Sequence, residues 1–254
     1  MKKRIQPHIM CGVGDVADYV LLPGDPKRTE KIATYFDVAR KVADYRGYVT
    51  YSGKVGEIPI STSSTGIGCP SAAIVVEELI KIGAKNLIRV GTTGALQPEI
   101  GIGDIIIATG AVRADGTTNA YVPIGYPAVA DFQIIKALIE AAEGLKKRFH
   151  LGIVVSSDAF YVENKDFIRL YNEANVLSVE MEASALFTIA NLKRLHAGAI
   201  LAVDSNLVTG IKKGEFELGE KTGELDHRVE RAIEDEIQIA INAVKLLENA
   251  HSFM

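Results

Sequence analysis

Residues 71–94, SAAIVVEELIKIGAKNLIRVGTTG, combine the two patterns that decide the fold. Apolar residues recur at helical spacing over Ser71–Ile82, and the short run Asn86–Val90 that follows is apolar on both faces apart from one arginine. A strand with two apolar faces is typical of a sheet that helices cover on both sides. The stretch therefore predicts a helix that is followed by a buried strand.

The same alternation continues along the chain. Further apolar runs bounded by glycine-containing turns predict strands at Tyr19–Leu22, Ile58–Ser61, Asp104–Ala108, Gly152–Val155 and Ala197–Val203. Helical spacing and capping residues predict helices at Asp25–Phe36, Asp131–Gly144, Asp166–Glu173, Glu182–Ala190 and Glu224–Asn249. This alternation indicates an α/β fold with one central sheet.

No repeat, low-complexity stretch or proline-rich linker divides the chain. We therefore predict a single domain over residues 1–254, with a central mixed β-sheet flanked by helices. The apolar stripe of the last helix predicts packing as its role, with charged residues on the other face. Two long polar segments, Arg113–Val129 and Val208–Gly223, are candidate lids.

Composition narrows the class of protein and its partners. Of 254 residues, 48% are hydrophobic and 24% are charged, and the formal net charge is -4, which favours neither nucleic acid nor an anionic membrane as a partner. The two cysteines and five histidines lack metal-ligand spacing, so we expect no metal. The chain shows no leader-like or membrane-spanning segment, which favours a cytoplasmic protein.

Two segments carry arginines that suit an anion. Gly24 and Arg28 lie in a strand–turn–helix segment, where main-chain amides and an arginine fork could hold phosphate, although a surface arginine fits the pattern as well. Arg89 lies inside an apolar strand and needs an anionic partner. That partner is either a ligand, with Thr92 and Thr93 completing its coordination, or a local acid.

Two other segments carry carboxylates. Glu180 and Glu182 flank Met181 at a predicted strand-to-helix junction. A buried pair of acids needs donors such as ribose hydroxyls, whereas a solvated helix start rich in glutamate is the alternative. Asp204 ends an apolar strand at the edge where open α/β sheets bind ligands. It is a candidate general acid, or else it caps the next turn.

Six specific motifs follow one another along the chain, within a segment that runs from about Pro7 to Asn249. They are PGDP-x-R at Pro23–Arg28, STGIGCPSAAIVVEEL at Ser64–Leu79, IRVGTTGALQP at Ile88–Pro98, YPAVADF at Tyr126–Phe132, SSDAFY at Ser156–Tyr161 and VEMEA at Val179–Ala183. With them the chain resembles the nucleoside phosphorylase superfamily, which includes purine nucleoside phosphorylases and uridine phosphorylases. The resemblance implies cleavage of nucleosides by inorganic phosphate, without metal or organic cofactor, in a homo-hexamer built as a trimer of dimers.

The resemblance also implies roles for individual residues. The phosphate ligands would be Gly24, Arg28, Arg89 and Thr92, with Arg46 from a neighbouring subunit; from its own pattern Arg46 is only a charged residue in a turn. The nucleoside ligands would be His8, Thr93, Gly94, Phe160, Glu180, Met181 and Glu182. Among these, Glu182 and Met181 would hold the ribose, Phe160 would stack on the base, and His8 would cross the dimer interface to the 5′-hydroxyl.

The base-recognition segment departs from the pattern of uridine phosphorylases. Those enzymes carry Gln-x-Arg after a Phe-Tyr pair, whereas the segment here is Phe160-Tyr161-Val162-Glu163-Asn164-Lys165. A site without that amide and guanidinium should discriminate poorly for uracil. The segment therefore favours a purine nucleoside as substrate.

The order Val203-Asp204-Ser205 decides where the acid is expected. Bacterial purine enzymes carry Ser-Asp here, which aligns their aspartate with Ser205, whereas the Val-Asp-Gly of apicomplexan purine phosphorylases is nearer to this chain. We therefore predict a purine nucleoside phosphorylase with Asp204 as its catalytic acid. The alternatives are a uridine phosphorylase, a nucleosidase that uses water, and a nucleoside-binding protein without catalysis. The sequence leaves the preferred base open.

Overall fold

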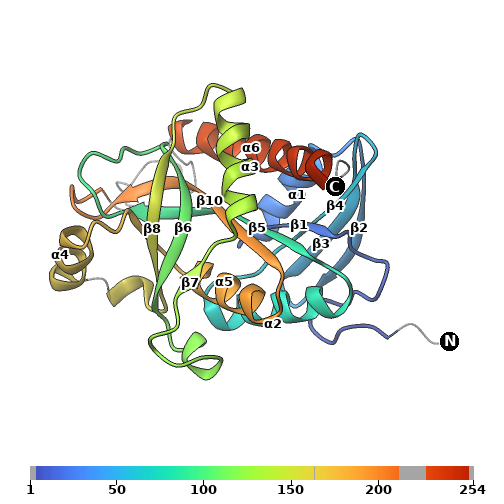
Figure 1. Ribbon diagram of the computed structural model, residues 1–254, viewed down its shortest axis with the longest axis horizontal. Coiled ribbons are helices and arrows are strands. Elements are labelled where there is room, and N and C mark those ends of the chain that lie inside the picture. The colour runs from blue at the N-terminus through green and yellow to red at the C-terminus, as the bar shows by residue number, and fades with distance from the viewer. Residues whose placement is uncertain (1–3, 163, 212–226, 252–254) are drawn as a thin grey trace, which may run out of the picture.

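A computed structural model describes residues 4–162, 164–211 and 227–251 (Figure 1). All six predicted strands are present, as β1 (Tyr19–Leu22), β4 (Ile58–Ser63), β5 (Asn86–Ala95), β6 (Ile105–Ala114), β8 (His150–Ser157) and β10 (His196–Asn206). The six predicted helices are α1 (Pro26–Ala33), α2 (Cys69–Lys81), α3 (Phe132–Gly144), α4 (Lys165–Glu173), α5 (Ala183–Leu192) and α6 (His227–His251). Residues 224–226 of the last prediction lie outside the described residues. Within the described part of the chain, no helix is long and apolar enough to cross a membrane.

Four strands were not predicted from the sequence, namely β2 (Val38–Tyr45), β3 (Tyr48–Val55), β7 (Ala128–Val129) and β9 (Ser178–Glu180). β2 is an edge strand with mostly exposed residues, so it has no apolar run. β2 and β3 form a hairpin whose turn residues, Arg46 and Gly47, have φ values of 55° and 83°. Two successive positive φ angles are typical of the type I′ turn that joins tight hairpins.

The sheet is mixed and partly closed. Its order is β10-β6-β8-β9-β5-β1-β4-β3-β2, with β7 beside β6, and β10 also pairs with β5. This last pairing closes β10, β6, β8, β9 and β5 into a ring. β1, β5 and β10 are parallel neighbours, and the register places Leu22 beside Arg89 and Val203 beside Thr93. The carboxyl ends of these strands therefore meet at one edge of the sheet.

Helices cover both faces of the sheet, with α2 and α5 on one side and α3 and α6 on the other (Figure 1). Val76 of α2 and Phe187 of α5 belong to the first apolar core, whereas Leu138 of α3 and Ile237 of α6 belong to the second. The α/β fold with a mixed sheet between helices is thus confirmed. Each strand end is held from two sides, which gives the site at that edge a rigid base.

The candidate lid at Arg113–Val129 begins within β6, contains a short 3-10 turn at Thr118–Ala120 and ends in β7. The guanidinium of Arg113 donates to main-chain carbonyls of four residues between Val122 and Tyr126, at 2.7–3.2 Å. These bonds tie the loop back to the strand from which it leaves. The other predicted lid, Val208–Gly223, lies largely outside the described residues, because the description stops at Ile211.

Replacing Arg113 by methionine is expected to raise hydrogen exchange at amides 116–127 by about tenfold or more. Hydrogen bonds from a charged donor contribute about 1.5–3 kcal/mol each, and their loss lets the loop open. Arg169→Met is the matched control, because Arg169 is exposed and pairs across one helical turn with Asp166. Unchanged exchange in the Arg113 variant would show that the packing of the loop itself holds it.

Candidate active site

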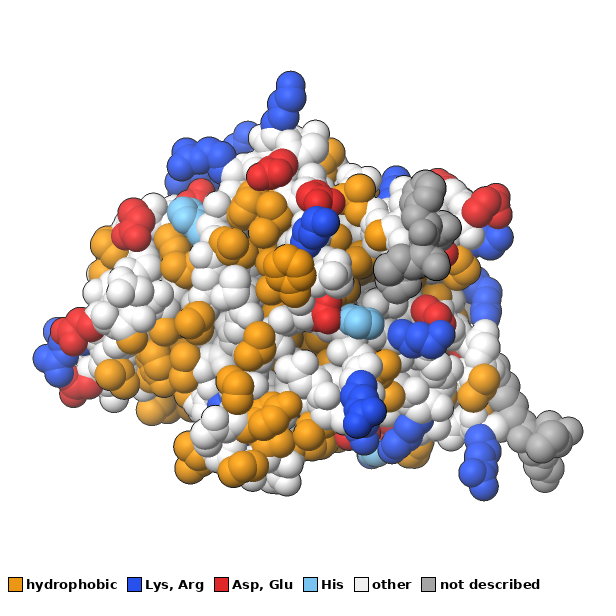
Figure 2. All heavy atoms as spheres, viewed as in Figure 1, with side chains coloured by type: hydrophobic (Ala, Val, Ile, Leu, Met, Phe, Trp, Pro, Cys, Tyr) orange, Lys and Arg blue, Asp and Glu red, His pale blue; other side chains and the backbone are white. Residues whose placement is uncertain are grey.

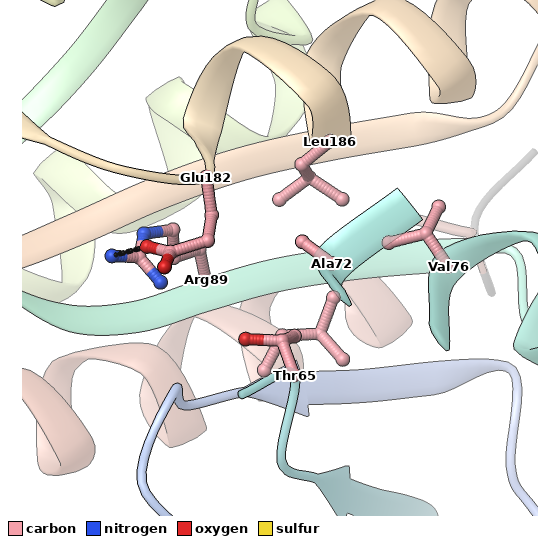
Figure 3. A pocket seen from close by; sticks show the side chains of 7 residues that line it. Thr65, Ala72, Val76, Arg89, Glu182 and Leu186 are labelled. Carbon is pink, nitrogen blue, oxygen red and sulfur yellow. Dashed lines mark ion pairs between the residues drawn. The ribbon is translucent and has the colours of Figure 1, made fainter. Parts of the chain in front are cut away.

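Arg89 lies on β5 and is buried, with 5% of its surface exposed. Its Nε lies 2.8 Å from Oε2 of Glu180, and its Nη2 forms an ion pair with Oε2 of Glu182 (Figure 3). Gly91 makes room for the guanidinium, since a Cβ there would lie 3.0 Å from Cζ of Arg89. The buried arginine of the strand is thus compensated by two acids that are distant in sequence, rather than by a local one.

The guanidinium of Arg89 has donor capacity that a ligand could use. Its Nη1 is buried and has no hydrogen-bond partner in the described part of the chain. Buried donors in proteins almost always have partners. An oxygen of a bound anion would satisfy this nitrogen, and Arg28, whose side chain is 12% exposed, offers a second guanidinium at the same edge.

Glu180 is held by the protein itself. Its carboxylate accepts hydrogen bonds from the main-chain amides of Glu182 at 2.8 Å and Ala183 at 2.9 Å, and from Oγ of Ser156 at 2.5 Å. It therefore caps the start of α5 while it pairs with Arg89. The alternative of a solvated helix start is wrong, because Glu180 and Glu182 are 4% and 5% exposed. Both oxygens of Glu180 are occupied, which indicates that it positions Arg89.

Glu182 faces a small pocket at the start of α2. Its Oε1 accepts a hydrogen bond from the amide of Gly68 at 2.6 Å. Figure 3 shows its carboxylate against Arg89, beside apolar side chains that include Ala72 and Leu186. Burial raises the pKa of Glu182, and the nearby Glu180 adds to this effect, while Arg89 opposes it. Both of its oxygens have protein partners, but each carboxylate oxygen can accept a second hydrogen bond, and Glu182, unlike Glu180, lines the pocket where a hydroxyl donor could bind.

Asp204 is the extra residue of a β-bulge. Val203 pairs with Thr93 and Ser205 pairs with Gly94, so Asp204 has no register partner on β5. A bulge resets the alternation of side chains and is common beside active sites. Ser205 Oγ donates to Asp204 Oδ1 at 2.9 Å. The turn after β10 is capped by Asn206, which accepts from the amides of Val208 and Thr209, so Asp204 is not needed as a cap there.

The other residues predicted on β1 and β5 lie at the same edge. Gly24 is in the turn after β1, where its carbonyl accepts from the amide of Gly66 at 3.1 Å. Thr92 is half-buried near the end of β5. Thr93 donates through Oγ1 to the carbonyl of Val179 at 2.7 Å, and a Cβ at Gly94 would lie 2.5 Å from Leu207. Thr93 and Gly94 therefore join β9 and β10 to β5.

Four predicted residues lie outside this cluster or at its margin. Arg46 is exposed at the tip of the β2–β3 hairpin, and its guanidinium stacks on Tyr45. His8 pairs through Nδ1 with Oε1 of Glu78 at 2.6 Å. Phe160 is 45% exposed in a short 3-10 turn, Phe160–Val162, and Met181 is half-buried between the two glutamates.

Glu236 was not among the residues predicted for the site, and it lies on α6 with 0% exposure and its Oε1 3.5 Å from Nη1 of Arg28. We assigned charged residues to the solvated face of this helix, and for Glu236 that assignment is wrong. A signal was present, because position 236 follows Ile233 by three residues and precedes Ala240 by four, which places it on the apolar stripe.

Buried arginine and carboxylate side chains at the edge where three parallel strands end could hold an anion and a polar organic ligand. The family described as the Phosphorylase superfamily matches residues 18–244, so the chain belongs to this superfamily. Its curated relatives confirm membership of the nucleoside phosphorylases. The uridine phosphorylase of Thermococcus kodakarensis is 50% identical over 228 residues, which cover 84% of this chain and 82% of that protein. The guanosine phosphorylase of Halorubrum lacusprofundi is 42% identical over 242 residues, which cover 95% of this chain and 99% of that protein.

Solved structures of both substrate classes share the fold. Purine nucleoside phosphorylase from Toxoplasma gondii, in complex with immucillin-H, superimposes with a TM-score of 0.88 at 29% identity, over 98% of this chain and 99% of that one. Uridine phosphorylase from Vibrio fischeri superimposes with a TM-score of 0.84 at 33% identity, over 96% of this chain and 97% of that one. Neither comparison selects a base for this chain.

Proposed function

We propose that the protein catalyses reversible phosphorolysis of purine ribonucleosides, which yields the free base and ribose 1-phosphate. The observation that carries this proposal is the buried Nη1 of Arg89, which lacks a hydrogen-bond partner among the described residues, while Nη2 of the same guanidinium pairs with the carboxylate of Glu182. An anion at Arg89 and a hydroxyl donor at Glu182 would then be neighbours. Phosphate and ribose are ligands with these two properties.

The proposed reaction uses side chains at one edge of the sheet. Phosphate held by Arg28 and Arg89, with Gly24 and Thr92, attacks the anomeric carbon as the bond to the base breaks. Glu182 accepts hydrogen bonds from the ribose and keeps that carbon in line, with Met181 packed beside it. Asp204 donates a proton or hydrogen bond to the departing base, over which Phe160 stacks. The reaction needs no metal or organic cofactor.

Uridine is the second candidate substrate, and the relative from Thermococcus kodakarensis supports it. The purine proposal is supported by two observations on this chain. The segment Phe160–Lys165 lacks the Gln-x-Arg pattern of uridine phosphorylases. Asp204 directly follows Val203, as the aspartate does in the Val-Asp-Gly segment of apicomplexan purine phosphorylases. The guanosine phosphorylase relative, which matches over 99% of its length, adds support.

We further propose that the site is completed by a neighbouring subunit in a homo-hexamer, through Arg46 at the phosphate and His8 at the 5′-hydroxyl. Both side chains reach solvent in the single chain. Figure 2 shows hydrophobic side chains gathered on part of one face. Exposed apolar residues include Val129, Phe132, Leu151, Ile153 and Leu170. Contiguous exposed apolar surface is typical of subunit interfaces.

Glu78→Gln is expected to raise KM for a purine nucleoside about tenfold and to leave KM for phosphate unchanged. Glu78 pairs with Nδ1 of His8 and accepts from the amides of His8 and Ile9, so its carboxylate orients the ring. Glu77→Gln is the matched control on the same helix, because Glu77 pairs with Lys193. With a 5′-deoxynucleoside the Glu78 variant should equal wild type; an equal loss there would remove the 5′-hydroxyl role.

Base release from inosine, adenosine, guanosine and uridine, each with and without inorganic phosphate, tests the proposed function. We expect release that requires phosphate and is fastest with a purine nucleoside. Faster release from uridine would keep the phosphorylase and reject the purine assignment. Release without phosphate would indicate a nucleosidase, and ligand binding without any release would indicate a binding protein.

A further inference from the structure

Glu236 is a buried carboxyl group that the proposed reaction does not use. It lies on α6, is fully buried, and has its Oε1 3.5 Å from Nη1 of Arg28. Neither of its oxygens has a hydrogen-bond partner of good geometry in the described part of the chain. A buried carboxylate without well-formed hydrogen bonds is costly, so its protonation state depends on the groups around it, which include the main-chain amide of Ala202.

The charged groups that face Glu236 come from three elements. They are Arg28 of α1, Arg89 of β5 and Asp204 of β10. The charged residues of α3, which packs on α6, are Lys136, Glu140 and Glu143, and all three are exposed. On α6 itself, Glu234 pairs with Lys31 and Asp235 pairs with Lys147. Glu236 therefore responds mainly to the arginines of the anion site.

The charges already present in the site disfavour the binding of a further anion. Two guanidinium groups, those of Arg28 and Arg89, face three buried carboxyl groups, those of Glu180, Glu182 and Glu236. If all three acids were ionised, phosphate would enter a site that already carries excess negative charge. Arg28 would also be shared between Glu236 and the phosphate, because both lie within reach of one guanidinium.

We propose that Glu236 is a positioning residue that takes up a proton when phosphate binds, which releases Arg28 from Glu236 to the anion. The conjugate acid of the buffer supplies the proton and is left as its base, and the product is the neutral carboxylic acid of Glu236 beside the Arg28–phosphate pair. This proposal rests on the phosphate site of the proposed function. It makes phosphate affinity depend on the protonation of a residue that does not touch the substrate.

The environment of Glu236 places its uptake of a proton in an accessible pH range. Burial raises its pKa to about 8, Arg28, Arg89 and the main-chain amide of Ala202 oppose the rise, and Asp204 adds to it. A phosphate dianion at Arg28 raises the pKa further, so the complex holds more protons than the free protein at pH 8 and above. Binding that takes up protons weakens as the pH rises. Phosphate affinity should therefore fall between pH 7 and pH 9.

Calorimetric titration of the intact protein with phosphate, at pH 7 and pH 9 and in buffers of different ionisation enthalpy, tests the proposal. At pH 9 free phosphate is already a dianion, so proton uptake on binding reports on the site. Wild type is expected to take up a proton at pH 9, and Glu236→Gln is not. The variant should match wild type in affinity at pH 7 and bind phosphate up to about tenfold more tightly at pH 9.

Glu236→Leu is a second neutral variant that suits the apolar neighbourhood, and it should behave as Glu236→Gln does. Glu234→Gln is the matched control on the same helix and should keep the pH dependence of wild type. Phosphate binding without proton uptake by wild type at pH 9 would overturn the role of Glu236 and leave the proposed function intact. If wild type bound no phosphate at either pH, both would be overturned.

Discussion

Arg89→Met is expected to lower the free energy of unfolding by about 3–5 kcal/mol at pH 8, because it leaves two buried carboxylates without their cation. Methionine fills a similar volume, so the loss comes from charge rather than from a cavity. Glu180 and Glu182 both depend on this guanidinium in the folded protein. Chemical denaturation of the variant and of wild type measures the difference.

The loss should be smaller at pH 5 than at pH 8, and the sign follows from burial. Burial raises the pKa of Glu182 in the folded state, and removing Arg89 removes an effect that lowers it. A carboxyl group whose folded pKa is raised is most stable when protonated, so its stability is lost as the pH rises through that pKa. Adding Glu182→Gln to the Arg89 variant should restore part of the loss. An equal loss at both pH values would contradict this account.

Asp204→Asn is expected to lower kcat for purine nucleosides by about 10²–10⁴-fold, the range that general acid catalysis contributes. Asparagine keeps the size of the side chain and cannot supply the proton. KM for phosphate should change less than about threefold, since Asp204 has no proposed contact with the anion and acts on the base. Steady-state kinetics with phosphate and nucleoside varied separately measure both effects.

Ser205→Ala separates the two possible positions of the acid. Ser205 donates one hydrogen bond to Asp204, and its loss should reduce kcat by less than about tenfold. A nucleoside whose purine is already cationic, such as an N7-methylated one, needs no proton and should be cleaved by the Asp204 variant at close to the wild-type rate. A larger effect at Ser205 than at Asp204 would move the acid to position 205.

The secondary structure was predictable wherever a local pattern existed. The six apolar runs and six helical segments correspond to real elements because burial of one or two faces imposes a periodicity on neighbouring residues. β2 is exposed along most of its length, and β7 and β9 contain two and three residues. Such strands carry no periodic signal, so they were missed.

The site was predictable in its residue types and less so in its arrangement. The arginine in the apolar strand β5 indicated that it has an anionic partner, and Glu180 and Glu182 were predicted as a possible buried pair. The sequence could not show that these groups compensate each other. Their pairing depends on β9 lying against β5, and a three-residue strand gives no sign of where it pairs.

Sequence alone therefore determined the α/β class, the order of its elements and the set of polar residues at the strand ends, because these follow from local periodicity and composition. Tertiary structure alone decided which charges share Arg89, the bulge that offsets Asp204, and the approach of Glu236 to Arg28. The physical reason is the separation along the chain over which each effect acts. Periodicity acts between residues a few positions apart, whereas the energy of a buried charge depends on which distant segments the folded chain brings beside it.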